Sequence, residues 1–169
     1  MESSKERYIP ALGYKTLTPL YDPIVAVTCR EKKFKQALLI QAGIKDGHRV
    51  LDLGCGTGTF AVQIKRSIPG AQIISIDGDG KILEIARSKA EKAGVDVEFH
   101  LCYSSELPFD SNSFDRVVSS LFFHHLVIDQ KISTIREVFR VLKPHGELHV
   151  ADRAGLGKLD SDISGKAAL

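Results

Sequence analysis

The feature that most constrains the fold is a glycine-rich turn within residues 50–60, which read VLDLGCGTGTF. An apolar, strand-like run ends there, and Gly54, Gly56 and Gly58 follow at every second position. Glycine has no Cβ, so such a turn lets a ligand approach the backbone N–H groups closely. The stretch therefore predicts a strand, a tight turn and a helix built around a binding site.

The rest of the chain alternates between helix-like and strand-like segments. Apolar residues recur at helical spacing in residues 30–43, 59–67, 80–94 and 129–143. Short apolar runs predict strands at residues 49–54, 71–77, 95–102, 113–123 and 146–152. Strands that alternate with helices of this length indicate an α/β fold with a mostly parallel sheet covered on both faces.

Composition excludes several classes of protein. A chain of 169 residues fits one domain, and a net charge of +2 is too balanced for a nucleic-acid-binding surface. No apolar run reaches the length of a membrane span, and the N-terminus lacks the apolar core of a signal peptide. The cysteines Cys29, Cys55 and Cys102 form no CxxC pair, so neither a disulfide framework nor a zinc site is indicated. These features are typical of a reducing compartment, and we therefore expect a cytoplasmic protein.

The residues around the glycine turn favour one ligand class. Dinucleotide-binding turns read GxGxxG, whereas this turn reads GxGxG and follows Asp52, an acid that would repel a pyrophosphate. A carboxylate suits a ligand that carries an ammonium group. Asp77 ends the next predicted strand and can accept hydrogen bonds from two vicinal ribose hydroxyls. These residues favour S-adenosylmethionine over NAD.

Five motifs occur in the order and spacing of a known family. They are VLDLGCGTG, IISID, ELPFDSNSFDRVVSS, FFHHL and EVFRVLKPHGELHVAD, between about residues 21 and 152. The chain resembles class I S-adenosylmethionine-dependent methyltransferases, in particular those of ubiquinone and menaquinone biosynthesis. The resemblance implies a Rossmann-like three-layer αβα sandwich with strand order 3-2-1-4-5, shortened at the C-terminus.

The resemblance also implies which residues bind the cofactor, whose product would be S-adenosylhomocysteine. Gly54, Cys55, Gly56 and Gly58 would line its methionine and ribose parts, and Asp52 would hold the methionine ammonium group through water or the loop. Asp77 and Gly78 would bind the ribose. The remaining contacts are assigned to Ile82 and Leu107 as apolar walls on the adenine, and to Ser104, Ser120 and Leu121.

One position departs from the family pattern. The family has an aspartate after the third strand that accepts the adenine amino group, and this chain has Tyr103 there, between Cys102 and Ser104. A tyrosine supplies no carboxylate, but it can accept through its hydroxyl or stack on the ring. Cys55 and Cys102 are interpreted as small packing residues.

His124 and His125 follow the fourth predicted strand, where a methyl donor would face its acceptor. A neutral histidine there could remove a proton from the acceptor, and the alternative is that one ring packs while the other is solvated. No metal site is predicted, because adjacent histidines point apart and no acidic cluster joins them.

The two ends complete the expected organisation. Residues 1–28, with Tyr8, Tyr14 and Tyr21, are interpreted as an N-terminal arm or lid. Residues 29–155 would form the cofactor-binding domain, and 156–169 a short flexible tail. Relatives continue past the fifth strand with further strands, so an open sheet edge is expected, through which the chain could form a homodimer.

The predicted function is methyl transfer to a small-molecule acceptor by in-line displacement. The Ser119-Ser120-Leu121-Phe122 segment differs from the loops of nucleic-acid methyltransferases, which agrees with the weak net charge. Two alternatives remain open: a chain that binds the cofactor but turns over poorly, and a non-catalytic interaction module that keeps the fold. An NAD-dependent dehydrogenase is a more distant alternative.

Overall fold

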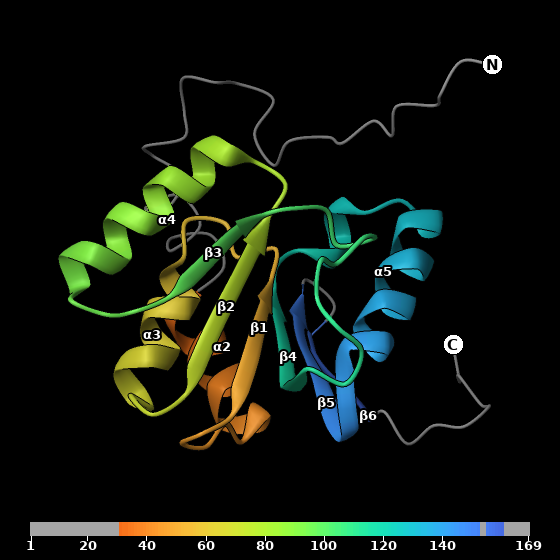
Figure 1. Cartoon of the computed structure of the whole chain (residues 1–169), viewed down its shortest axis with the longest axis horizontal. Helices are drawn as coiled ribbons and strands as arrows, with labels where there is room; N and C mark the ends of the chain where they lie inside the picture. Colours follow the sequence, from red (N-terminus) through yellow and green to blue (C-terminus); the bar gives the residue numbers. More distant parts are fainter. Residues whose placement is uncertain (1–30, 153–154, 161–169) are drawn as a thin grey trace.

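A computed structural model describes residues 31–152 and 155–160, with side chains for residues 33–152 (Figure 1). The proposed N-terminal arm and residues 161–169 of the tail lie outside this part. The helices are α2 (Glu31–Ala42), α3 (Thr59–Ser67), α4 (Gly80–Ala93), the 3-10 turn η2 (Phe123–His125) and α5 (Ile128–Val141). The strands are β1 (Arg49–Leu53), β2 (Gln72–Asp77), β3 (Glu98–Leu101), β4 (Phe114–Ser120), β5 (Leu142–Asp152) and β6 (Gly155–Asp160).

The six strands form one sheet in the order β3-β2-β1-β4-β5-β6. The first five are parallel, as the alternation of helices and strands predicts, and β6 pairs antiparallel with β5. Strands β2 and β3 lie on one side of β1, and β4 and β5 lie on the other side, so the strand order reverses between β1 and β4. In parallel sheets a ligand site is expected outside the carboxyl ends of the strands at such a switch point.

Helices cover both faces of the sheet and make three layers (Figure 1). On one face α2 and α3 pack on β1, β2 and β4 through a buried cluster that includes Leu38, Phe60 and Val50, and α4 packs against α3 and β3. On the other face Val138 and Val141 of α5 pack on Leu51 and neighbouring strand residues. Alternate residues of β1 therefore face opposite helical layers, as the pleat requires.

Two regions differ from the sequence prediction. β5 begins at Leu142 rather than at residue 146, because Leu142 pairs with Phe114 before a register shift, and His145 then takes a positive φ of 65°. The sequence predicts a flexible tail from residue 156, but residues 155–160 form β6. This segment satisfies the backbone groups of the β5 edge, so the open edge expected beside β5 is paired within the chain.

Among the helices of the described ranges, none combines the length and apolar character needed to cross a lipid bilayer.

Candidate cofactor and acceptor site

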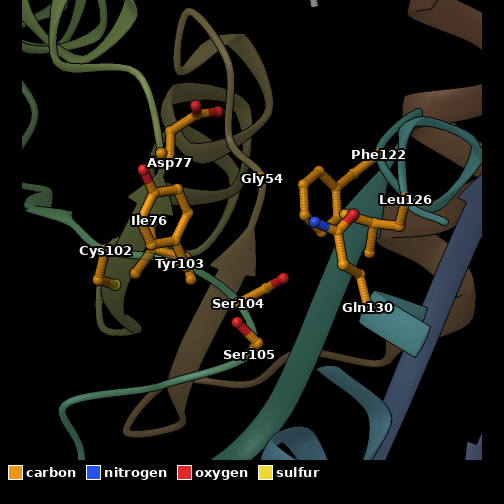
Figure 2. A pocket seen from close by; sticks show the side chains of 11 residues that line it. Gly54, Ile76, Asp77, Cys102, Tyr103, Ser104, Ser105, Phe122, Leu126 and Gln130 are labelled. Atoms are coloured by element: carbon orange, nitrogen blue, oxygen red, sulfur yellow. The ribbon is translucent and has the colours of Figure 1, made fainter. Parts of the chain in front are cut away.

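A pocket opens at the carboxyl ends of β1 and β2, beside the switch point. It encloses about 470 Å³, its open mouth included. Figure 2 shows Asp77 and Tyr103 on one side and Phe122, Leu126 and Gln130 on the other, with the backbone of Gly54 behind them. Its full lining is Gly54, Ile76, Asp77, Gly78, Cys102, Tyr103, Ser104, Ser105, Phe122, Leu126 and Gln130.

Gly54, the first glycine of the turn, forms the back of this pocket. Gly54 has a φ of +69°, and a Cβ added to it would lie 2.2 Å from the Phe122 ring, so only glycine fits beneath that side chain. Gly56 has a φ of +54° with open space where a Cβ would lie. Its N–H donates a 2.9 Å hydrogen bond to Asp77 Oδ2. The turn is therefore joined to the end of β2 through the Asp77 carboxylate.

Asp77 is fixed by two backbone groups. Gly56 N–H bonds to one carboxylate oxygen, and Asp79 N–H donates a 3.0 Å bond to the other. Burial raises the pKa of Asp77, while these backbone hydrogen bonds act in the opposite direction. The Gly78 backbone also lowers this pKa. Since a carboxylate has about four lone-pair positions, Asp77 keeps the capacity to accept from a ligand hydroxyl, and its contact with a ribose stays a prediction. Asp79 itself caps α4 by accepting from Lys81 N–H.

Asp52 lies behind the turn and does not line the pocket. Its side chain is 1% exposed, and in the described part of the chain its Oδ2 has no hydrogen-bond partner. It shares the face of β1 that α2 and α3 cover, where the buried Lys35 lies. Burial raises the pKa of Asp52 to about 7; the Lys35 charge opposes this shift and the Asp77 charge adds to it. Its contact with a methionine ammonium group stays a prediction.

The segment after β3 lines the same side of the pocket as Asp77. Tyr103 is 50% exposed at the pocket rim, and the buried Ser104 hydroxyl shares a 2.7 Å hydrogen bond with Thr134 of α5. No carboxylate stands at position 103, as the sequence indicates. A contact of the Tyr103 ring with a ligand stays a prediction.

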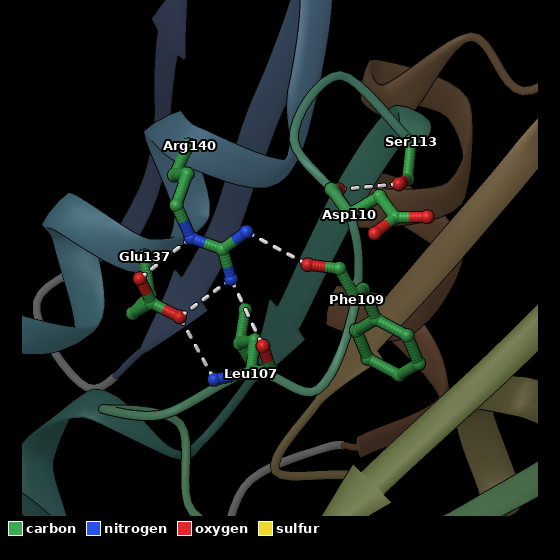
Figure 3. A network of polar contacts seen from close by, with 6 residues as sticks. All are labelled: Leu107, Phe109, Asp110, Ser113, Glu137 and Arg140. Atoms are coloured by element: carbon green, nitrogen blue, oxygen red, sulfur yellow. Dashed lines mark hydrogen bonds and ion pairs between the residues drawn. The ribbon is translucent and has the colours of Figure 1, made fainter.

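A salt-bridged pair on α5 holds the loop that follows this segment (Figure 3). Glu137 accepts the Leu107 N–H at 2.8 Å and pairs with Arg140. Arg140 donates to the carbonyl oxygens of Phe109 and Leu107 at 2.7 and 2.9 Å. The Arg140 hydrogen bond lowers the pKa of Glu137, so the carboxylate stays ionised at neutral pH. We call this arrangement the α5 clamp.

The other predicted cofactor residues divide into two groups. Gly78 and Ser104 line the pocket, whereas the residues outside its lining are Cys55, Gly56, Gly58, Ile82, Leu107, Ser120 and Leu121. Ile82 is buried on α4, and Leu121 has a positive φ of 56°, with its N–H bonded to the Ala151 carbonyl. Their contacts with a cofactor stay predictions.

The two cysteines have raised thiol pKa values. Burial raises the pKa of Cys55 well above its usual value and that of Cys102 to about 11. The thiolate is the nucleophilic form, so both shifts agree with the packing role predicted for these residues.

His124 and His125 lie in η2 at the carboxyl end of β4, outside the pocket lining. The two rings lie close together, with centroids 4.0 Å apart. His124 Nδ1 lies 2.7 Å from Asp152 Oδ1, and the His124 backbone N–H donates to Asp152 Oδ2 at 2.9 Å. The structure therefore joins His124 to the last residue of β5.

Sequence reasoning did not identify several pocket residues or the partner of His124. The missed lining residues are Ile76, Ser105, Phe122, Leu126 and Gln130. Asp152 ends β5 just as Asp77 ends β2. Because the carboxyl ends of parallel strands meet at one edge of a sheet, the position of Asp152 in the sequence could have identified it as a site residue.

Within residues 33–152, no group of three or more potential ligand side chains could hold a metal ion.

Comparison with known proteins places this site in a family. Residues 50–146 match the family described as "Methyltransferase domain". The ubiquinone/menaquinone biosynthesis C-methyltransferase UbiE of Pasteurella multocida is 35% identical over 114 residues, which are 66% of this chain and 42% of that protein. The chain thus spans less than half of this curated relative.

Solved structures agree with the sequence matches. A SAM-dependent methyltransferase from Aquifex aeolicus superposes with a TM-score of 0.69 at 25% identity, covering 79% of this chain and 72% of that one. Phosphoethanolamine N-methyltransferase 2 of Haemonchus contortus, solved with S-adenosyl-L-methionine, gives a TM-score of 0.63 at 30% identity, covering 69% of this chain and 27% of that one. With the parallel sheet, the glycine turn and the acid that ends β2, these matches show that the chain belongs to the class I S-adenosylmethionine-dependent methyltransferases.

Proposed function

We propose that the chain transfers a methyl group from S-adenosylmethionine to a small-molecule acceptor. The observation that carries this proposal is the Asp77 carboxylate. It lies in the pocket beside the glycine turn, held by two backbone N–H groups and with lone pairs left over. A rigid acid in that place suits a ribose diol, because a charge-assisted hydrogen bond is worth roughly 1.5–3 kcal/mol.

The pocket residues fit the rest of the cofactor. Gly78 and the backbone of Gly54 line the pocket next to Asp77, and Tyr103 lies at its rim, where its ring can stack on adenine. Apolar side chains on the other side, Phe122 and Leu126, exclude water from the space before them. When bound, the cofactor supplies a methyl group already activated by a sulfonium, so the chain needs mainly to bind and align the reactants.

The acceptor is proposed to be small. The relatives include enzymes named for ubiquinone, menaquinone and phosphoethanolamine, and the balanced charge of the chain lacks the excess of cations typical of nucleic-acid-binding surfaces. The acceptor would enter over the carboxyl ends of β4 and β5, where η2 and the start of α5 lie next to the pocket (Figure 1). His124 and His125 are the candidate bases there.

Calorimetric titration tests the proposal. The purified chain is titrated with S-adenosylmethionine, S-adenosylhomocysteine and, as a control ligand, NADH. We expect binding of the first two and none of NADH. Asp77→Ala should weaken binding by about ten-fold or more, since it removes at least one charge-assisted hydrogen bond.

Asp79→Ala is the matched control. It removes an acid two residues away that caps α4, so it should lower the free energy of unfolding by about 1 kcal/mol and leave cofactor affinity nearly unchanged. Equal loss of affinity in both variants would contradict the role of Asp77. Absence of binding in the folded wild-type chain would overturn the proposal and favour a non-catalytic module.

A further inference from the structure

The contact between His124 and Asp152 differs from the contacts of three other histidines, His48, His100 and His149. His100 and His149 turn Nε2 toward the carboxylates of Glu98 and Glu147, at 2.5 and 2.9 Å. His48 Nδ1 lies 3.3 Å from the Lys45 N–H, which it accepts. Each of these contacts favours a proton on Nε2 when the ring is neutral.

His124 shows the opposite arrangement. Its Nδ1 faces Asp152 Oδ1 at 2.7 Å, and a carboxylate can only accept, so Nδ1 carries the proton. The second oxygen of Asp152 accepts the His124 backbone N–H, which fixes the carboxylate relative to the ring. A neutral His124 therefore presents Nε2 as a proton acceptor, the state that a general base needs.

The place of the pair in the fold suits that role. His124 lies in η2 between Phe122 and Leu126, which both line the pocket, and Asp152 ends β5 at the same edge of the sheet. The side chains of His124 and Asp152 are 22% and 14% exposed, so the ring is sheltered but reachable. His125 packs against the same ring.

We propose that His124 is the general base for a hydroxyl-bearing acceptor and that Asp152 is its positioning residue. This inference rests on the proposed methyltransferase function and names the acceptor class of the same site. The hydroxyl proton passes to His124 Nε2, the oxygen lone pair forms the new bond to the methyl carbon, and the carbon–sulfur bond breaks with its electrons on sulfur. Asp152 balances the imidazolium until Nε2 releases its proton to water.

The chemistry favours a hydroxyl over an amine. A neutral amine attacks through its lone pair and can lose its proton afterwards to water, so it gains little from a fixed base. A hydroxyl oxygen is a weak nucleophile until its proton begins to leave, and a positioned base contributes typically 10²–10⁴-fold to such a step. An oriented pair of this kind is therefore of more use for methylation of a hydroxyl than of an amine. Phe122 lines the pocket next to this pair, and an aromatic side chain there favours an aryl hydroxyl.

Imidazole ¹H–¹⁵N correlation spectra of the ¹⁵N-labelled chain test the tautomer directly. The His124 signals are identified by their loss in His124→Gln. We expect the unprotonated shift at Nε2 for His124 and at Nδ1 for His48 and His100, which serve as internal references. Asp152→Ala should move the His124 proton to Nε2. A wild-type His124 with its proton on Nε2 would overturn the inference, and this result does not depend on whether Asp152→Ala folds.

Ligand titration tests the acceptor class. Phenol is added to the chain loaded with S-adenosylhomocysteine, with anisole, which lacks the hydroxyl proton, as the matched probe. We expect phenol alone to shift the His124 Nε2 signal saturably. Equal shifts with both probes, or none with either, would overturn the inference. Calorimetry on the same sample distinguishes failure of this inference from failure of the proposed function. If S-adenosylhomocysteine does not bind, the proposed function itself is rejected.

Discussion

Asp52 makes the stability of this protein depend on pH. Its carboxyl group is buried behind the glycine turn, and burial raises its pKa from 3.8 to about 7. The unfolded chain loses this proton near pH 4, whereas the folded chain keeps it to near neutrality. Folding therefore takes up a proton between these pH values, and the free energy of unfolding must fall as pH rises through that window.

The size of the effect follows from the two pKa values. Each unit of difference corresponds to 1.36 kcal/mol, so the full cost of ionising Asp52 in the folded chain is 1.36 × (7 − 3.8), or about 4 kcal/mol. Between pH 5 and pH 8 the same relation gives about 3 kcal/mol. Asp52→Asn keeps the shape of the side chain and removes its titration, so this part of the pH dependence should disappear.

Urea unfolding followed by far-UV circular dichroism measures the effect, since the chain contains no tryptophan for fluorescence. The quantity of interest is the difference in free energy of unfolding between wild type and Asp52→Asn at pH 5 and at pH 8. This difference should shift by about 3 kcal/mol in favour of the variant at the higher pH.

Ser75→Ala is the matched control, because Ser75 is buried in β2 directly opposite Asp52 and carries no charge. Its effect should be the same at both pH values. If the Asp52→Asn difference were also constant with pH, the buried carboxyl would not titrate as argued, and the reasoning would be refuted.

Two further predictions concern the packing of the site. Gly56→Ala should lower the free energy of unfolding by about 1–2 kcal/mol, because alanine tolerates a positive φ less well than glycine. Gly54→Ala should lower it by a further 1–3 kcal/mol or so, because its Cβ would also collide with Phe122. Equal losses for the two variants in thermal or urea unfolding would contradict the placement of that ring. Glu137→Ala should lower the free energy of unfolding by about 1–3 kcal/mol and weaken S-adenosylhomocysteine binding in calorimetry, because the 102–113 loop loses its anchor on α5. Arg140→Lys should lower both the stability and the affinity by less. Unchanged binding in a destabilised Glu137 variant would show that the loop holds its position without the clamp.

The sequence could predict the layers of this fold because its signals are local. The glycine turn, the acid that ends β2 and the cap at Asp79 each follow from neighbouring residues, and the structure confirms these elements within a few positions. Alternation of helices and strands then limits the sheet to a mostly parallel order.

The remaining features depend on contacts between distant residues. Asp152 meets His124 across 28 positions, and Phe122, which follows β4, covers Gly54, which follows β1. The periodic spacing of apolar residues along the sequence carries no information about such contacts. The sequence does not predict β6 for a different reason. Its glycine-rich sequence has weak strand propensity, and it forms a strand because it pairs with the edge of β5.

The α5 clamp has a consequence for protein engineering. Glu137 and Arg140 bind the backbone N–H and carbonyl groups of Leu107 and Phe109, not their side chains. An anchor of this kind is indifferent to which residues the loop carries. Positions 103 and 105, which line the pocket, can therefore be randomised, and the loop should keep its path while the shape of the pocket is redesigned.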